Sequence, residues 1–173
     1  MTGFGSFFSS SRSSTLKTKL RSGLVVDNDS PVMEVLGAIE ELDRMIDVIK
    51  VFSRLPDVIF FMTTLQEGLS AITIEISQTG LLNISDHHLD SLAKNLELVG
   101  DGSPFTAMGR EARAFSGLAA ALCRRVERCM CTLIDLNCSA TGLSDYPSGL
   151  QTPQSGLIYI SGSTKLLDML GKC

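Results

Sequence analysis

The chain has 173 residues, of which 44% are hydrophobic and 20% charged, a composition typical of one globular domain and not of a disordered protein. Its net charge of −4 argues against a nucleic-acid-binding surface as the main function. No uninterrupted apolar run exceeds the six residues 118–123, whereas a membrane-spanning helix requires roughly 20 residues, so no membrane span is expected.

Residues 1–26 contain no acidic residue, but they contain four basic residues and seven serines. This composition predicts a mitochondrial import signal, and a flexible Ser-rich arm on a cytoplasmic protein is the alternative interpretation. Within the arm, Thr2, Gly3 and Gly5 belong to a glycine-rich turn whose amides could hold a phosphate. Residues 27–173 are expected to form the single folded domain.

Ser30 and Pro31 predict the start of the first helix, because a capping hydroxyl followed by proline at the first helical position is a typical helix start. Apolar residues at helical spacing follow on both sides of a break at 55–56, which predicts two long helices. The second helix is expected to end at Gly80, and Ser85 is expected to cap a third, shorter helix.

A long central helix is expected from about 106 to 137, after a break at 100–104 that is rich in glycine and contains proline. Residues 138–156 have the composition of a loop, and a last helix is expected over 157–170. No segment predicts a convincing strand. The sequence therefore predicts an all-α fold, a five-helix bundle.

The central helix has an apolar stripe and a charged face. Its apolar residues recur at spacings of three and four and are expected to face the core: Phe115, Leu118, Ala119, Leu122, Val126, Cys129, Leu133 and Leu136. Arg124, Glu127 and Arg128 share a face roughly opposite this stripe, because each residue advances the helix by about 100°. Such a face either forms solvated ion pairs, worth about 0.3–0.5 kcal/mol each, or builds a site against a second surface.

The five cysteines form no CxxC pair, and three of them lie in the expected central helix. The only two histidines, His87 and His88, are adjacent at the expected start of the third helix. We therefore expect reduced thiols and no metal site.

Four stretches carry a resemblance to a known family, in the right order along the chain. Residues 2–6 are similar to the motif T-G-D-x-G-x-T, 35–43 to G-x-V-D-E-L-N, 65–76 to I-Q-x-x-L-F-x-x-x-x-E-L, and 124–128 to R-R-A-E-R. These are motifs of the ATP:cob(I)alamin (corrinoid) adenosyltransferases of the propanediol-utilisation type. The resemblance implies a five-helix bundle that assembles as a homotrimer.

The resemblance also implies that ATP, with Mg²⁺, lies between neighbouring subunits and donates its adenosyl group to cobalamin. The residues that it assigns to nucleotide binding are Thr2, Gly3, Gly5, Arg124, Glu127 and Arg128. Arg124 would contact phosphate, because the planar guanidinium forms paired, charge-assisted bonds with phosphate oxygens. Glu127 would hold the polar network of the site.

The chain departs from the family pattern at several positions. Phe4 stands where the family has the acid of T-G-D, and Ala120 stands where it has the arginine of A-R-T. The acidic partner of that arginine survives as Glu40, and Asp43 replaces an asparagine. The stretch 159–165 lacks the asparagine and arginine of Y-L-N-R-L-S-D. A triphosphate leaving group needs such cations and donors, each typically worth about 2.7–4 kcal/mol.

Lost site residues beside intact apolar stripes predict a catalytically degenerate relative that serves as a structural or assembly subunit of a larger, mitochondrial complex. The outer face of the central helix would then contact other protein subunits. One alternative is a divergent but active adenosyltransferase, which would use ATP with Mg²⁺ and cobalamin. The other alternative is a binder of a nucleotide or corrinoid without turnover.

Overall fold

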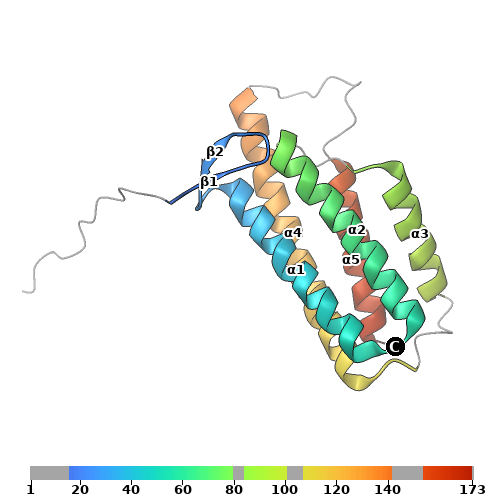
Figure 1. Ribbon diagram of the computed structural model, residues 1–173. Coiled ribbons are helices and arrows are strands. Elements are labelled where there is room, and N and C mark those ends of the chain that lie inside the picture. The colour runs from blue at the N-terminus through green and yellow to red at the C-terminus, as the bar shows by residue number, and fades with distance from the viewer. Residues whose placement is uncertain (1–15, 80–83, 101–106, 142–153, 173) are drawn as a thin grey trace, which may run out of the picture.

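The computed structural model describes residues 16–79, 84–100, 107–141 and 154–172 (Figure 1). Within these ranges five helices form a bundle, which confirms the expected all-α fold. Their bounds are α1 Pro31–Ser53, α2 Pro56–Thr79, α3 Asp86–Gly100, α4 Arg110–Thr141 and α5 Gln154–Lys172. Helix α4 packs mainly against α1 and α5, and α3 packs against α5 and α2. No helix within the described ranges is long and apolar enough to cross a membrane.

A small antiparallel hairpin precedes the bundle, where the sequence predicted no strand. It consists of β1 (Lys17–Lys19) and β2 (Val25–Asp27), joined by a turn in which Gly23 has a φ of 87°. Three residues are too few for the alternation that identifies a strand in a sequence. The backbone N–H of Ser22 donates to the carbonyl of Ser77 at 3.1 Å, so the hairpin is held at the carboxyl end of α2.

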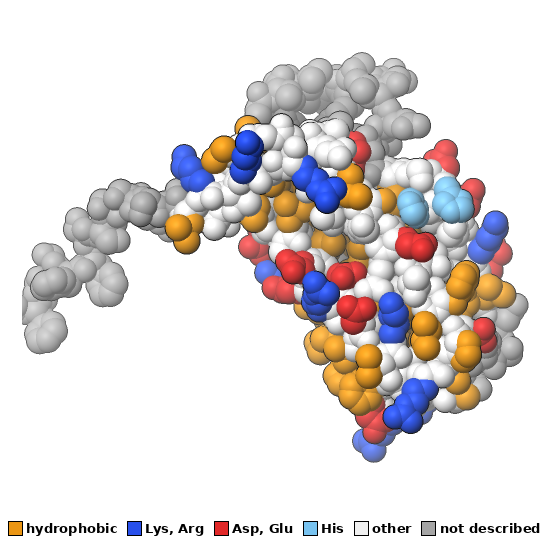
Figure 2. Space-filling view, viewed as in Figure 1, with side chains coloured by type: hydrophobic (Ala, Val, Ile, Leu, Met, Phe, Trp, Pro, Cys, Tyr) orange, Lys and Arg blue, Asp and Glu red, His pale blue; other side chains and the backbone are white. Residues whose placement is uncertain are grey.

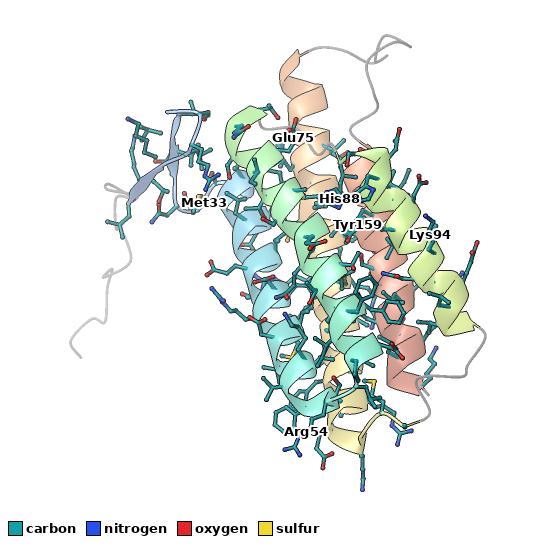
Figure 3. The ribbon with its side chains drawn as sticks, turned by 45° about the vertical axis from the view of Figure 1, so that its right-hand side comes forward. Met33, Arg54, Glu75, His88, Lys94 and Tyr159 are labelled. Atoms are coloured by element: carbon teal, nitrogen blue, oxygen red, sulfur yellow. The ribbon has the colours of Figure 1, made fainter. Side chains whose placement is uncertain are left out.

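The predicted boundaries of α1 are confirmed, and the chemistry of the caps explains them. The side chain of Ser30 accepts a hydrogen bond from the N–H of Met33, and Pro31 occupies the first turn. Arg54 ends the helix in the left-handed conformation, with a φ of 54°. Figure 3 shows Met33 and Arg54 at opposite ends of α1.

The core lies where the apolar stripes of α1 and α2 meet those of α4 and α5. The apolar residues that recur at helical spacing in α2 are buried: Val58, Phe61, Met62, Leu65, Leu69, Ile72 and Ile76. From α5, Tyr159 is 1% exposed, and its hydroxyl donates to the carbonyls of Thr64 at 3.2 Å and Leu65 at 3.3 Å (Figure 3). The packing that the sequence predicted for these helices is therefore present.

Helix α4 differs from its prediction in its limits and in part of its buried face. It begins at Arg110 and ends at Thr141, and residues 107–109 are not helical. The buried positions are Ala112, Ser116, Ala119, Ala120, Cys123, Val126, Met130 and Leu133. Leu118 and Leu136, expected in the core, are exposed, because small residues such as Ala112 and Ala120 face the neighbouring helices instead. The last helix is also longer than predicted, 154–172 instead of 157–170.

Candidate functional site

Arg124, the residue expected to contact phosphate, forms an ion pair within its own chain. Its guanidinium donates to the carboxylate of Asp168 on α5 at 3.0 Å. Both side chains remain partly exposed, so the pair contributes only about 0–1 kcal/mol to stability. It nevertheless gives the Arg124 guanidinium a carboxylate partner within its own chain. The sequence did not reveal Asp168, because it lies 44 residues further along the chain.

Arg125, the second arginine of the 124–128 motif, joins α4 to α1. It donates to Glu34 at 2.8 Å and to Glu41, two carboxylates seven residues apart on one face of α1. These bonds raise the pKa of the guanidinium above its ordinary value. Arg125 therefore links the surfaces of α4 and α1. The spacing of Glu34 and Glu41 was the signal that could have identified this role.

Glu127 and Arg128 do not complete a cluster with Arg124. Glu127 is half-buried, and no ion pair joins it to either arginine in the described part of the chain. Arg128 lines a cavity of about 280 Å³ beside the amino end of α1, together with Asp29, Glu34, Cys129 and Thr132. Arg124 is thus directed to α5 and Arg128 to the amino end of α1, although the two residues share one face of α4.

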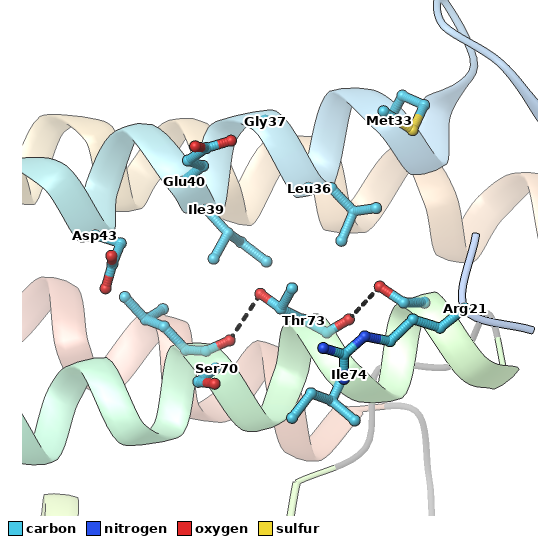
Figure 4. Close-up of a pocket in the computed structure, with 12 residues that line it drawn as sticks. Arg21, Met33, Leu36, Gly37, Ile39, Glu40, Asp43, Ser70, Thr73 and Ile74 are labelled. Atoms are coloured by element: carbon cyan, nitrogen blue, oxygen red, sulfur yellow. Dashed lines mark hydrogen bonds between the residues drawn. The ribbon is translucent and has the colours of Figure 1, made fainter. Parts of the chain in front are cut away.

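A larger cavity, of about 460 Å³, lies between α1 and α2 (Figure 4). Arg21 of the hairpin lies at one end and Asp43 at the other, with Glu40 on the α1 side. The hydroxyls of Thr73 and Ser77 line it, but both donate to carbonyls of their own helix. None of the α4 residues predicted for the site lines this cavity.

The position of the missing family arginine lies inside the core. Ala120 is fully buried, and its neighbour Cys123 donates through Sγ to the carbonyl of Ile160 at 3.9 Å. Burial raises the pKa of the Cys123 thiol to about 12, so it is neutral at physiological pH. Glu40 faces the cavity between α1 and α2, so these two positions do not meet within one chain.

Thr2, Gly3, Gly5 and Phe4 lie outside the described residues, so the structure says nothing about the predicted phosphate loop. Among the residues that are described, no group of three or more His, Cys, Asp or Glu side chains could hold a metal ion. Cys123, Cys129 and Cys131 are free thiols.

A model of the cobalamin adenosyltransferase family matches residues 14–146, which include helices α1 to α4. The chain belongs to the cobalamin adenosyltransferase family. No curated protein shows significant similarity to the chain. The match begins after the glycine-rich turn at 2–6 and ends before α5, so it includes Arg124, Glu127 and Arg128 but not Asp168.

Proposed function

We propose that this cobalamin adenosyltransferase-like chain is catalytically degenerate and serves as a structural or assembly subunit of a larger, mitochondrial complex. One observation carries the proposal: one arginine that the resemblance assigns to the family reaction is paired with a carboxylate, and another is replaced by alanine. Arg124 is bound to Asp168, and Ala120 is buried at the position of a family arginine. Adenosyl transfer to cobalamin releases triphosphate, which requires preorganised positive charge that these residues do not supply.

The exposed charges on the outer surface of α4 support the second half of the proposal. Arg125 is bound to Glu34 and Glu41 of its own chain, whereas Arg124 and Arg128 lie exposed on the outer surface of α4. The outer face of α4 is therefore the surface that we assign to contacts with other subunits, in a homotrimer or with other proteins.

Residual nucleotide binding is the second candidate, and Arg128 is the observation that favours it. In the described part of the chain this exposed guanidinium forms no ion pair, and it lies in a cavity beside the amino end of α1. Helix amino ends and arginines both favour anions. Asp29 and Glu34 line the same cavity and oppose a phosphate group, so we rank this function second.

The melting temperature with and without ATP and Mg²⁺ separates the two functions. A ligand that binds only the folded state raises the melting temperature by mass action. An assembly subunit shows no change with ATP, and Arg124→Ala weakens its co-purification with partner proteins. Arg44→Ala is the matched control, because Arg44 is an exposed arginine on α1 that pairs with Asp47 at 3.7 Å. A saturable shift with ATP that Arg124→Ala or Arg128→Ala abolishes would contradict the assembly role.

The mitochondrial location rests on the acid-free, serine-rich first 26 residues. A fusion of the full chain to a fluorescent protein is expected in mitochondria, and removal of residues 1–15 is expected to abolish import while leaving the hairpin and bundle intact. A full-length fusion that stays in the cytosol would refute the location.

A further inference from the structure

Helix α3 has the fewest buried residues of any helix in the described ranges. It lies at the edge of the bundle, where it packs against α5 and α2 (Figure 1). Only Leu92, Asn95 and Val99 of its 15 residues are buried, whereas α1 buries seven residues and α2 buries eight. The side of α3 that faces the solvent is mostly polar, and the two histidines mark the amino end of the helix in Figure 2. Two buried apolar side chains, with Leu89 and Leu96 half-buried beside them, therefore hold α3 in place.

The third buried residue of α3 is polar and has no partner. The side chain of Asn95 is 5% exposed and lies between Leu92 and Val99 on the buried stripe. Its amide can donate two hydrogen bonds and accept two, but it forms none with any residue that the structure describes. A buried polar group without a hydrogen bond destabilises the packed state relative to a state in which water reaches the group. Asn95 therefore favours states in which α3 has left the bundle.

The other helices are joined to their neighbours by polar contacts. The hydroxyl of Tyr159 on α5 donates to the carbonyl of Thr64 on α2 at 3.2 Å. The side chain of Gln66 on α2 donates to Asp47 on α1 at 3.0 Å, and Arg124 joins α4 to α5. By contrast, no ion pair or hydrogen bond joins a residue of α3 to another helix in the part of the chain that is described.

The polar contact nearest to α3 lies just before its amino end. The N–H of Ile84 donates to the hydroxyl of Ser155, at the start of α5, at 3.0 Å. Further along, Leu92 lies over Gly162 of α5, where an added Cβ atom would be 2.8 Å from Cδ2 of the leucine. Gly162 lets the two helices approach, but one flexible side chain makes this contact. Helix α3 is therefore fastened at its amino end and held by apolar packing towards its carboxyl end.

We infer that α3 opens from the bundle as a unit while α1, α2, α4 and α5 remain packed. The bond between Ile84 and Ser155 holds the hinge, and the carboxyl end of α3 moves away. Opening exposes Leu92, Val99 and the surface of α5 around Gly162, and it gives the amide of Asn95 access to water. This opening goes beyond the proposed function and does not depend on it, because it follows from the packing of the bundle alone.

Hydrogen exchange of the full chain, followed by mass spectrometry of peptic fragments, measures this opening. Fragments from α3 are expected to exchange about 100-fold faster than fragments from the middle of α1 and α2, because local opening exposes only the amides of the segment that opens. Equal exchange rates in all helices would show that the bundle opens only as a whole, and this would overturn the inference.

Asn95→Leu is expected to slow the exchange of α3 by roughly 10-fold and to leave α1 unchanged, because leucine has the same branched outline and no hydrogen bonds to lose. The better helix propensity of leucine accounts for only about twofold of this change. Lys94→Leu, at an exposed position of the same helix (Figure 3), is the matched control and is expected to change the rate by less than about twofold. Unchanged or faster exchange of α3 in Asn95→Leu would overturn the inference.

Ser155→Ala tests the hinge separately and serves if Asn95→Leu does not fold. It removes the acceptor of the Ile84 N–H, so α3 is expected to exchange faster still while α1 and α2 keep their rates. Far-UV circular dichroism shows that each variant remains folded. An equal increase of exchange in all helices of Ser155→Ala would show that α3 does not open on its own.

Discussion

Gly68→Ala is expected to destabilise the protein because the ring of Tyr159 lies directly over the glycine. A Cβ atom at this position would lie 2.2 Å from Cζ and Oη of Tyr159 and 2.6 Å from Cε1. Ordinary carbon contacts are about 3.5–4.0 Å, so the ring has to move by more than 1 Å or α2 and α5 have to separate. Neither is easy, because Tyr159 is buried and its hydroxyl bonds to two carbonyls of α2.

The magnitude follows from opposing contributions. Displacing a buried aromatic ring lowers the free energy of unfolding by about 3–5 kcal/mol, and replacing glycine by alanine inside a helix raises it by about 1 kcal/mol. Gly68→Ala is therefore expected to lower the free energy of unfolding by about 2–4 kcal/mol. Gly37→Ala in α1 is the matched control, because a Cβ there meets nothing within 4 Å, and it is expected to stabilise the protein by about 0.5–1 kcal/mol.

Urea unfolding followed by circular dichroism at 222 nm measures both variants. Gly68→Ala/Tyr159→Leu is expected to recover part of the loss, which a double-mutant cycle reports as a coupling energy. If Gly68→Ala were as stable as Gly37→Ala, the contact between α2 and α5 described here would be refuted.

Three further predictions concern the packing and the charges. Leu65→Ala is expected to lower the free energy of unfolding by about 2–5 kcal/mol. Leu122→Ala is expected to lower it by less, because Leu65 is 1% exposed while Leu122 is half-buried. Urea unfolding that ranks the two variants in the opposite order would contradict the assignment of the core. Burial raises the pKa of Cys123 from 9.0 to about 12, so the contribution of this thiol to stability is complete below pH 9 and is lost as the pH rises towards 12. The free energy of unfolding is therefore expected to fall less between pH 8 and pH 10.5 in Cys123→Ala than in the wild type. An equal fall in both proteins would exclude this effect. Arg125→Ala is expected to lower the melting temperature more at low salt than at 1 M NaCl. The reason is that Glu34 and Glu41 lose an exposed cationic partner, and high salt already screens the attraction between these charges. A decrease that does not depend on salt would argue against the ion pairs.

The helices could be predicted from the sequence because their signals are local. Ser30, Pro31 and the break before Pro56 fixed the limits of α1, and the apolar spacing identified the buried face of α2. The buried face of α4 was only partly predicted. Leu118 follows the same spacing as the core residues, but small residues at 112, 116 and 120 pack inside and leave it on the surface. Periodicity shows that a face is apolar, but it does not show which part of that face a neighbour covers.

The candidate site could be predicted only as a set of residues, and not as an arrangement. The sequence indicated Arg124, Glu127 and Arg128 on one helix face, which spacing alone determines. Their partners come from α5 and from the start of α1, and such long-range pairs leave no local signal. The pairing of Arg124 with Asp168 was therefore visible only in the structure.

Formation of adenosylcobalamin from ATP, Mg²⁺ and chemically reduced cobalamin tests the central claim most directly. The purified full chain is expected to give no turnover above the enzyme-free reaction in the visible spectrum, even at high protein concentration. Arg124→Ala is expected to give the same result as the wild type. Turnover by the wild type that disappears in Arg124→Ala would contradict the account and show that the chain is an active adenosyltransferase.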